Sequence, residues 1–152
     1  MDKATLRVSS KQGERGYCLK NWHTSWLVLV IMGKRILAID DNPAILDVLN
    51  EILSFEGYEV VTISDGRKVF DTVEQVHPDL ILLDVMLDNL DGREICRALK
   101  NNRMFSGIPV IMISATHDLK SLLDQPGAPD DFIAKPFDIY YLISKVNHQL
   151  AA

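Results

Sequence analysis

The segment Leu80-Ile81-Leu82-Leu83-Asp84 places an acidic residue directly after four consecutive aliphatic residues. Such an unbroken apolar run indicates a strand that is buried on both faces, as strands of parallel sheets are. The carboxyl ends of parallel strands lie along one edge of the sheet, and sites form at that edge. We therefore expect the carboxylate of Asp84 to lie in a functional site.

Three further apolar runs also end on polar side chains. Like charges held a few ångströms apart raise one another's pKa, unless a hard cation such as Mg²⁺ lies between them. If the polar residues that follow these runs meet Asp84 at one edge of the sheet, they predict a Mg²⁺ site beside a reactive carboxylate. The runs are Ile36-Leu37-Ala38-Ile39 before Asp40-Asp41, Ile108–Ile113 before Ser114, and Phe132-Ile133-Ala134 before Lys135-Pro136.

Strand-like and helix-like stretches alternate with short connections from residue 34 onward, which predicts an α/β domain with a doubly wound parallel sheet. Asn42 is a suitable N-cap and Pro43 a suitable first helical residue for the first helix, which Gly57 ends. We expect five strands and five helices. The strands are expected at 35–39, 58–63, 80–83, 108–113 and 131–134. The helices are expected at 43–56, 66–76 and 117–125, with one more that begins after residue 92 and a last one that begins near residue 139.

The chain divides by composition into a basic N-terminal extension, residues 1–32, and one domain, residues 33–152. The extension holds 5 basic and 2 acidic residues, against 11 basic and 19 acidic residues in the domain. We expect the extension to be disordered or to reflect a mis-assigned translation start, with Met32 as a plausible natural first residue. The acidic domain is expected to repel nucleic acid, so no nucleic-acid partner is predicted.

A cytoplasmic setting is expected from the cysteines and the apolar segments. Cys18 and Cys96 show no metal-ligand spacing, which favours free thiols in a reducing compartment. The apolar run from Trp26 to Met32 is far shorter than the roughly 20 residues that span a bilayer. No membrane span is therefore predicted.

Together these landmarks make the chain similar to the receiver domain of bacterial two-component response regulators, over about residues 34–150. The similarity rests on four motifs at matching order and spacing. It implies a flavodoxin-like fold and a signalling switch that is phosphorylated on an aspartate. The motifs are Ile39-Asp40-Asp41-Asn42, Leu82-Leu83-Asp84, Ile113-Ser114-Ala115 and Ala134-Lys135-Pro136-Phe137.

The resemblance assigns a role to each polar group of the predicted edge. Asp84 is the expected phosphoacceptor, because a carboxylate can attack the phosphorus of a phosphohistidine and form an acyl phosphate. Lys135 and Ser114 are expected to neutralise and hold the phosphoryl oxygens, and a cis peptide is implied between Lys135 and Pro136. Mg²⁺ would be bound by Asp41 and Asp84, by the main-chain carbonyl of Met86, and by Asp40 through water.

A conformational switch is also implied by the resemblance. In the family, a hydroxyl drawn toward the phosphoryl group vacates space that an aromatic side chain then enters. Here those residues are Ser114 and Phe132. Phe132 lacks a phenolic hydroxyl, so no hydrogen bond could reinforce its inward position. Ile139, Tyr140 and Tyr141 could form an interaction face, although we expect most of that stripe to be core.

The sequence departs from the family pattern at several positions. Asp88 stands where a proline is common, four residues after the phosphoacceptor, so the loop after Asp84 is expected to be more mobile. Pro126 and Pro129 bound a short fourth helix. Met86 and Thr116 flank the path of an attacking water and offer no carboxylate or amide to orient it, which predicts slow loss of the phosphoryl group.

We interpret the chain as a stand-alone receiver that is not a conventional enzyme. Its expected partners are a sensor histidine kinase or histidine phosphotransfer protein and an unidentified downstream protein. One alternative is a receiver-like binding module that works without phosphorylation. Another is a Mg²⁺-dependent phosphohydrolase with an aspartyl nucleophile, which usually needs a second acid where Met86 stands.

Overall fold

The computed structural model describes residues 33–115, 123 and 125–152. The predicted N-terminal extension lies outside the described residues. The same holds for the predicted helix at 117–125, apart from Leu123 and Gln125.

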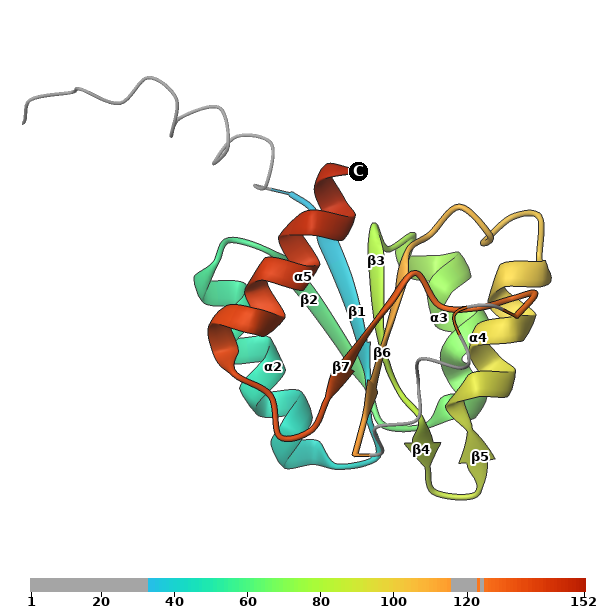
Figure 1. The fold of residues 1–152 in the computed structure, drawn as a ribbon, viewed down its shortest axis with the longest axis horizontal. Coiled ribbons are helices and arrows are strands. Elements are labelled where there is room, and N and C mark those ends of the chain that lie inside the picture. Colours follow the sequence, from blue (N-terminus) through green and yellow to red (C-terminus); the bar gives the residue numbers. More distant parts are fainter. Residues whose placement is uncertain (1–32, 116–122, 124) are drawn as a thin grey trace, which may run out of the picture.

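A five-stranded parallel sheet forms the centre of the domain (Figure 1). Its spatial order is β2-β1-β3-β6-β7, so the order reverses between β1 and β3. That reversal places a crevice at the carboxyl ends of β1 and β3, where Asp40 and Asp84 lie. The strands are β1 (Arg35–Ile39), β2 (Glu59–Ile63), β3 (Leu80–Asp84), β6 (Val110–Ser114) and β7 (Asp131–Ala134).

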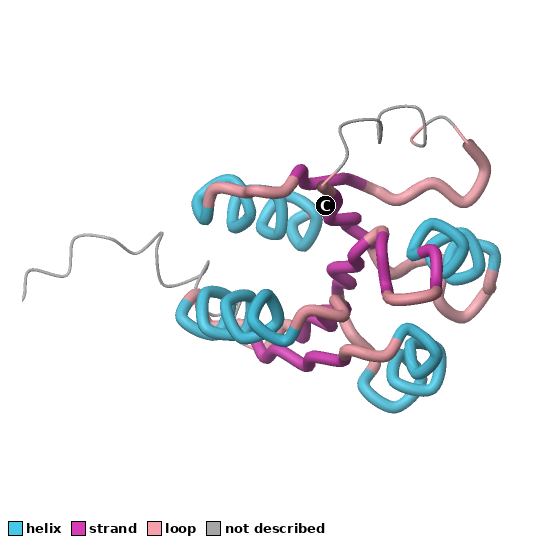
Figure 2. The backbone as a smooth tube through the Cα atoms, turned by 90° about the horizontal axis from the view of Figure 1, so that it is seen from below, coloured by secondary structure: helices cyan, strands magenta, loops and turns pink. Residues whose placement is uncertain are grey.

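Helices cover both faces of this sheet, as the alternating sequence pattern predicted (Figure 2). One apolar cluster joins the sheet to the first and last of these helices, and a second cluster joins it to the other two. The described residues hold four α-helices instead of the expected five: α2 (Pro43–Phe55) and α5 (Ile139–Ala151) on one face, and α3 (Val69–Val76) and α4 (Gly92–Asn101) on the other.

Local sequence signals account for where the helices begin and end. The side chain of Asn42 accepts a hydrogen bond from the N–H of Ala44, which caps α2 as expected. Gly57 adopts a φ of 95° just after that helix, a conformation that few other residues tolerate. A short 3₁₀ helix, η1 (Gly66–Lys68), precedes α3, so the predicted helix at 66–76 is divided in two. No described helix is long and apolar enough to cross a membrane.

A small hairpin follows β3, where the sequence predicted only a loop. Strands β4 (Met86–Leu87) and β5 (Leu90–Asp91) pair antiparallel, and Leu87 lies opposite Leu90. Leu87 is buried, so this connection is anchored to the core. The expectation that the loop after Asp84 is more mobile stays a prediction.

The expectation about the face of the last helix is wrong. Ile139, Tyr140 and Tyr141 are exposed at 47%, 82% and 48%, so most of that stripe is surface and not core. On α4 the buried face is formed by Ile95, Cys96 and Leu99, while Ala98 is exposed.

Candidate functional site

A lysine joins two buried carboxylates at the carboxyl edge of the sheet. The Nζ atom of Lys135, which follows β7, lies 2.7 Å from Oδ2 of Asp40 and 3.0 Å from Oδ2 of Asp84. These residues come from three different strand ends, and the two acids are only 1% and 6% exposed. Buried carboxylates need such partners, because an unpaired buried charge is strongly unfavourable.

The peptide between Lys135 and Pro136 is cis, as the resemblance implied. The Lys135 N–H donates a 2.6 Å hydrogen bond to the main-chain oxygen of Ser114. This bond ties the start of the Lys135 segment to the end of β6, and therefore fixes the lysine at the edge of the sheet.

Three carboxylates meet at this edge. One oxygen atom from each of Asp40, Asp41 and Asp84 can be chosen so that all three atoms lie within 4.8 Å of one another. Asp40 and Asp84 are buried, while Asp41 is half-buried. Of the described residues, this is the group of acids whose spacing suits a bound cation.

Backbone N–H groups orient these carboxylates. The N–H of Asn42 donates to Oδ1 of Asp40 at 2.9 Å, and the N–H of Met86 donates to Oδ1 of Asp84 at 3.3 Å. Oδ2 of Asp41 accepts a hydrogen bond from the N–H of Asp88 at 3.2 Å. Asp40 and Asp84 are thus each held by a backbone N–H two residues further along the chain, and Asp41 is held by the hairpin.

Burial and charge together set the protonation of the site. Desolvation raises the pKa of Asp84, and the nearby Asp40 charge adds to this, although the hydrogen bond and charge of Lys135 oppose it. For Lys135, burial alone would lower the pKa, but the hydrogen bonds and charges of Asp40 and Asp84 outweigh it and raise the pKa. The lysine is therefore held as a cation beside the two acids.

The residues present suit a magnesium ion. Mg²⁺ prefers one or two carboxylate ligands together with water. Asp40 and Asp84 each have both oxygens in protein hydrogen bonds, whereas Asp41 is less buried and engages one oxygen with Asp88. Asp41 is therefore the carboxylate with an oxygen most readily available to a cation.

Ser114 and Phe132 lie on the same face of the sheet. In the β6–β7 register Ser114 pairs with Ala134 and Met112 pairs with Phe132, and side chains two residues apart share a face. Ser114 is 2% exposed, while Phe132 is half-buried and packs against the cluster that contains Met112 and Phe105. The two candidate switch residues are therefore neighbours on adjacent strands.

The main feature that sequence reasoning missed is the hairpin, which brings the backbone of Asp88 to Asp41. A signal was present, since Asp88-Asn89 lies between two leucines and such residues are typical of tight turns.

In a doubly wound α/β domain ligands bind at the carboxyl edge of the sheet, and the acidic, lysine-bridged edge of this domain suits a cation. The sequence profile of the response regulator receiver domain matches residues 36–147. The chain belongs to that family and has the flavodoxin-like fold of a receiver domain, a phosphoryl-accepting signalling switch.

Known proteins resemble the chain in sequence and in structure. It is 35% identical over 120 residues to the DNA-binding response regulator MtrA of Mycolicibacterium smegmatis. That alignment covers 78% of this chain and 51% of MtrA. It is 39% identical over 114 residues to the DNA-binding dual master transcriptional regulator RpaA of Synechocystis, covering 74% of this chain and 47% of RpaA. The chain spans about half the length of these curated relatives.

A CheY-like response regulator receiver domain protein from Methanospirillum hungatei superimposes with a TM-score of 0.71 at 31% identity. The alignment covers 78% of this chain and 94% of that one. Here the similarity extends over nearly the whole of the compared structure.

The prediction that nucleic acid plays no part is wrong. MtrA and RpaA are both named as DNA-binding regulators. The prediction rested on the acidic balance of residues 33–152, which describes the surface of this domain alone. The net charge of one domain does not report what the rest of a longer relative binds. The expected histidine kinase partner fits the family.

Proposed function

We propose that this receiver accepts a phosphoryl group on Asp84, from a phosphohistidine of a sensor kinase or phosphotransfer protein, in a Mg²⁺-dependent reaction. The observation that carries the proposal is the convergence of Asp40, Asp41, Asp84 and Lys135 from separate strand ends. Structural carboxylates have no need of a third acid beside a buried pair, whereas phosphoryl transfer does need a cation site next to the nucleophile.

In this reaction a carboxylate oxygen of Asp84 attacks the phosphorus and the P–N bond to the donor imidazole breaks. The freed ring nitrogen keeps the electron pair, and the imidazole leaves as a neutral ring because its other nitrogen already carries a proton. When bound, Mg²⁺ supplies positive charge to the phosphoryl oxygens. Asp41 and Asp84, with the main-chain carbonyl of Met86, would hold the ion, and Asp40 would hold its water. The ion would therefore lie directly beside the Asp84 carboxylate that attacks the phosphorus.

Lys135 would move its ammonium group from Oδ2 of Asp84 to a phosphoryl oxygen as that oxygen becomes the site of negative charge. Its raised pKa keeps the amine protonated throughout the neutral range. The hydroxyl of Ser114 would donate to another phosphoryl oxygen. Each of these contacts stabilises the charge that is spread over the transferring group.

Phosphorylation would be read out through Ser114 and Phe132. Movement of the Ser114 hydroxyl toward the phosphoryl group opens space on the face that both residues share, and Phe132 then turns inward. Because Phe132 is half-buried in the unphosphorylated form, its exposure can change in either direction. Ring NMR signals of Phe132 before and after phosphorylation test this step, with Ser114→Ala as the variant that should uncouple it.

The central test is the intact mass of the purified protein after incubation with Mg²⁺ and acetyl phosphate. We expect a gain of one phosphoryl group that is lost in Asp84→Asn and in the presence of a chelator. Asp79→Asn is the matched control, because Asp79 is a half-buried aspartate at the opposite end of β3. If neither small donors nor a histidine kinase modify the protein, a binding module that works without phosphorylation replaces the proposal.

A further inference from the structure

The turn of the β4–β5 hairpin holds a residue in an unusual backbone conformation. Asp88 adopts a φ of 47°, in the left-handed region that non-glycine residues rarely occupy. Aspartate and asparagine tolerate this region better than most side chains do. The conformation directs the N–H of Asp88 to Oδ2 of Asp41, 3.2 Å away.

This hydrogen bond leaves one oxygen of Asp41 available for a cation. Among the described residues, the protein donor to the Asp41 carboxylate is the Asp88 N–H, and it engages Oδ2 alone. A carboxylate that is held by one oxygen cannot rotate freely, so its second oxygen keeps a fixed direction. Hydrogen bonds of this kind to ligating carboxylates are known to strengthen metal binding.

The position of Asp88 is itself fixed by the core. Leu87, the residue before it, is 2% exposed, and its Cδ1 atom would lie 3.1 Å from a Cβ atom placed on Gly66. At the base of the hairpin the Gly92 N–H donates to the main-chain oxygen of Val85 at 2.7 Å. The tip of the hairpin therefore cannot shift without disturbing buried contacts.

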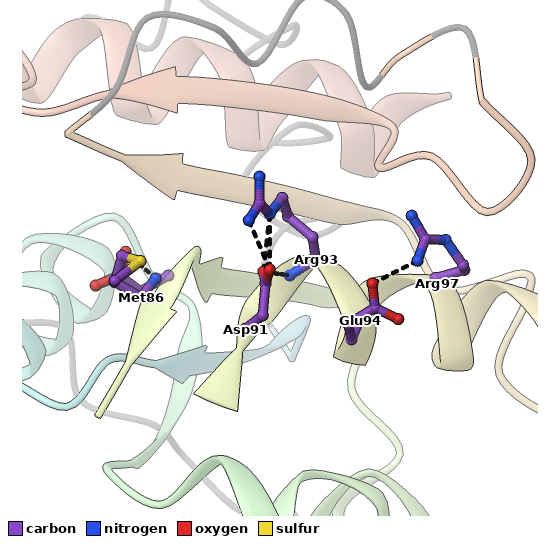
Figure 3. Close-up of polar contacts among 6 residues, drawn as sticks. Met86, Asp91, Arg93, Glu94 and Arg97 are labelled. Atoms are coloured by element: carbon purple, nitrogen blue, oxygen red, sulfur yellow. Dashed lines mark hydrogen bonds and ion pairs between the residues drawn. The ribbon is translucent and has the colours of Figure 1, made fainter. Parts of the chain in front are cut away.

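The far end of the hairpin is held by helix α4. The Asp91 side chain caps α4 by accepting the Arg93 N–H at 2.9 Å, and the Arg93 side chain folds back onto the same carboxylate (Figure 3). Glu94 and Arg97 pair one turn further along, while Met86 lies on the neighbouring strand (Figure 3). The hairpin thus continues directly into a capped helix, and the cap ties its second strand to α4.

The proline that is common at this place in the family could not make the contact with Asp41. Proline has no N–H, and its ring fixes φ near −65°. The residue that departs from the family pattern is therefore the one that supplies a donor to the candidate cation ligand.

We propose that Asp88 is a positioning residue for Asp41: its main-chain N–H orients the Asp41 carboxylate and so sets the affinity of the site for Mg²⁺. The inference rests on the proposed function, since it assigns a role toward the same cation. The backbone of Asp88 carries this role, and its exposed carboxylate contributes little, because exposed charges are screened by solvent.

The test is the dissociation constant for Mg²⁺ alone, measured by NMR titration of the full chain without a phosphoryl donor. Asp88→Pro removes both the donor and the left-handed conformation, and we expect affinity to fall by about tenfold, as for other residues that hold a ligand in place. Asp88→Gly and Asp88→Asn keep the N–H and remove the charge, and their affinities should stay within about threefold of wild type.

Several outcomes would overturn the inference. If Asp88→Pro binds Mg²⁺ as tightly as wild type, the donor is irrelevant and only the inference fails. Equal losses in Asp88→Gly, Asp88→Asn and Asp88→Pro would assign the effect to the carboxylate. If the wild-type protein binds no Mg²⁺, the proposed cation site fails as well.

A second measurement covers the case in which Asp88→Pro does not fold. In the wild-type protein the amide proton of Asp88 should exchange slowly with solvent, and Asp41→Ala should shift its resonance upfield and speed its exchange. An Asp88 amide that does not respond to Asp41→Ala would contradict the contact and the proposal with it.

Discussion

Lys135 determines the charge balance of the site before any phosphoryl group arrives. It contacts two carboxylates that are nearly inaccessible to solvent, and its raised pKa reflects those contacts, which outweigh the opposing effect of burial. The third carboxylate, that of Asp41, has no contact with this lysine among the described ion pairs. The site is therefore left with surplus negative charge near Asp41, which favours a divalent cation there.

The side chain of Met86 should determine how long the phosphoryl group stays on Asp84. Its side chain is 66% exposed and lies two residues after Asp84, where it has no polar group to orient an attacking water. We expect slow autodephosphorylation, and Met86→Asn should speed it by roughly tenfold, because an amide can orient the water without accepting its proton. The measurement is the decay of phosphoprotein by intact mass in Mg²⁺ after the donor is removed.

Met86→Leu is the control for that experiment, since it keeps an apolar side chain of similar size and should leave the decay unchanged. A wild-type half-life of only seconds would contradict the prediction, as would equal decay of the Asn and Leu variants.

At the level of elements, the hairpin depends on the absence of a side chain at Gly92. A Cβ atom there would lie 2.0 Å from the main-chain oxygen of Asp84. Gly92→Ala must therefore displace either α4 or the end of β3, and we expect a loss of about 3 kcal/mol in the free energy of unfolding. Phosphoryl acceptance should also fall, because Asp84 lies at the displaced end.

Gly57→Ala is the matched comparison for Gly92→Ala. Gly57 has a φ of 95° with nothing within 4 Å of a Cβ, so alanine meets backbone strain but no steric clash. We expect a cost of roughly 1–2 kcal/mol and unchanged phosphoryl acceptance. Denaturant melts and intact mass measure both effects, and equal behaviour of the two variants would refute the role of the Asp84 contact.

Strand β1 and the turn before β3 are joined through Asp79, and this contact should depend on pH. Its carboxylate accepts the N–H of Arg35 at 2.8 Å and pairs with Lys34 at 2.9 Å. Burial alone would raise the pKa of Asp79, but these two partners outweigh it and lower the pKa. Because the pKa of Asp79 is lower in the folded state, its contacts stabilise the protein fully above the unfolded-state pKa of about 3.9. This stabilisation is lost as pH falls through the pKa of Asp79 in the folded state.

Asp79→Asn should therefore cost about 0.5–1 kcal/mol at pH 7, after allowance for solvent screening of a partly exposed pair. The difference between wild type and variant in urea melts should begin to shrink as pH falls below about 3.9 and should go on shrinking at lower pH. A difference that is constant from pH 7 to pH 3 would show that the charge of Asp79 is not the cause.

The elements that sequence predicted well are those with long or unbroken patterns. The aliphatic run at 80–83 predicted a strand buried on both faces, and all of β3 is buried. Two-residue strands such as β4 and β5 show no periodicity, so the hairpin and its contact with Asp41 were missed. The exposure of Ile139 and Tyr140 was missed because an apolar stripe does not reveal where a helix lacks a covering neighbour.

On the scale of the whole molecule, all strands of the sheet run parallel, so their amino ends and their carboxyl ends lie at opposite edges of the domain. The candidate site lies at the carboxyl ends of the strands, whereas Gly33 precedes β1 at the amino ends. Five residues of β1 extend over about 16 Å, so anything attached before Gly33 joins the domain far from Asp84.

We therefore expect that a chain beginning at Met32 folds and accepts phosphate as the full chain does. Melting temperatures should agree within about 2 °C, a shift that corresponds to well under 1 kcal/mol for a domain of this size. Rates of phosphorylation by acetyl phosphate should agree within about twofold, because residues 1–31 join the domain at the opposite end of β1 from the site, farther than the Debye length of about 8 Å at 0.15 M salt. A larger change in either quantity would assign residues 1–31 a role in the domain.

Mass spectrometry that finds Met1 on the native protein would reject the proposal that translation begins at Met32, while leaving the comparison of the two chains valid.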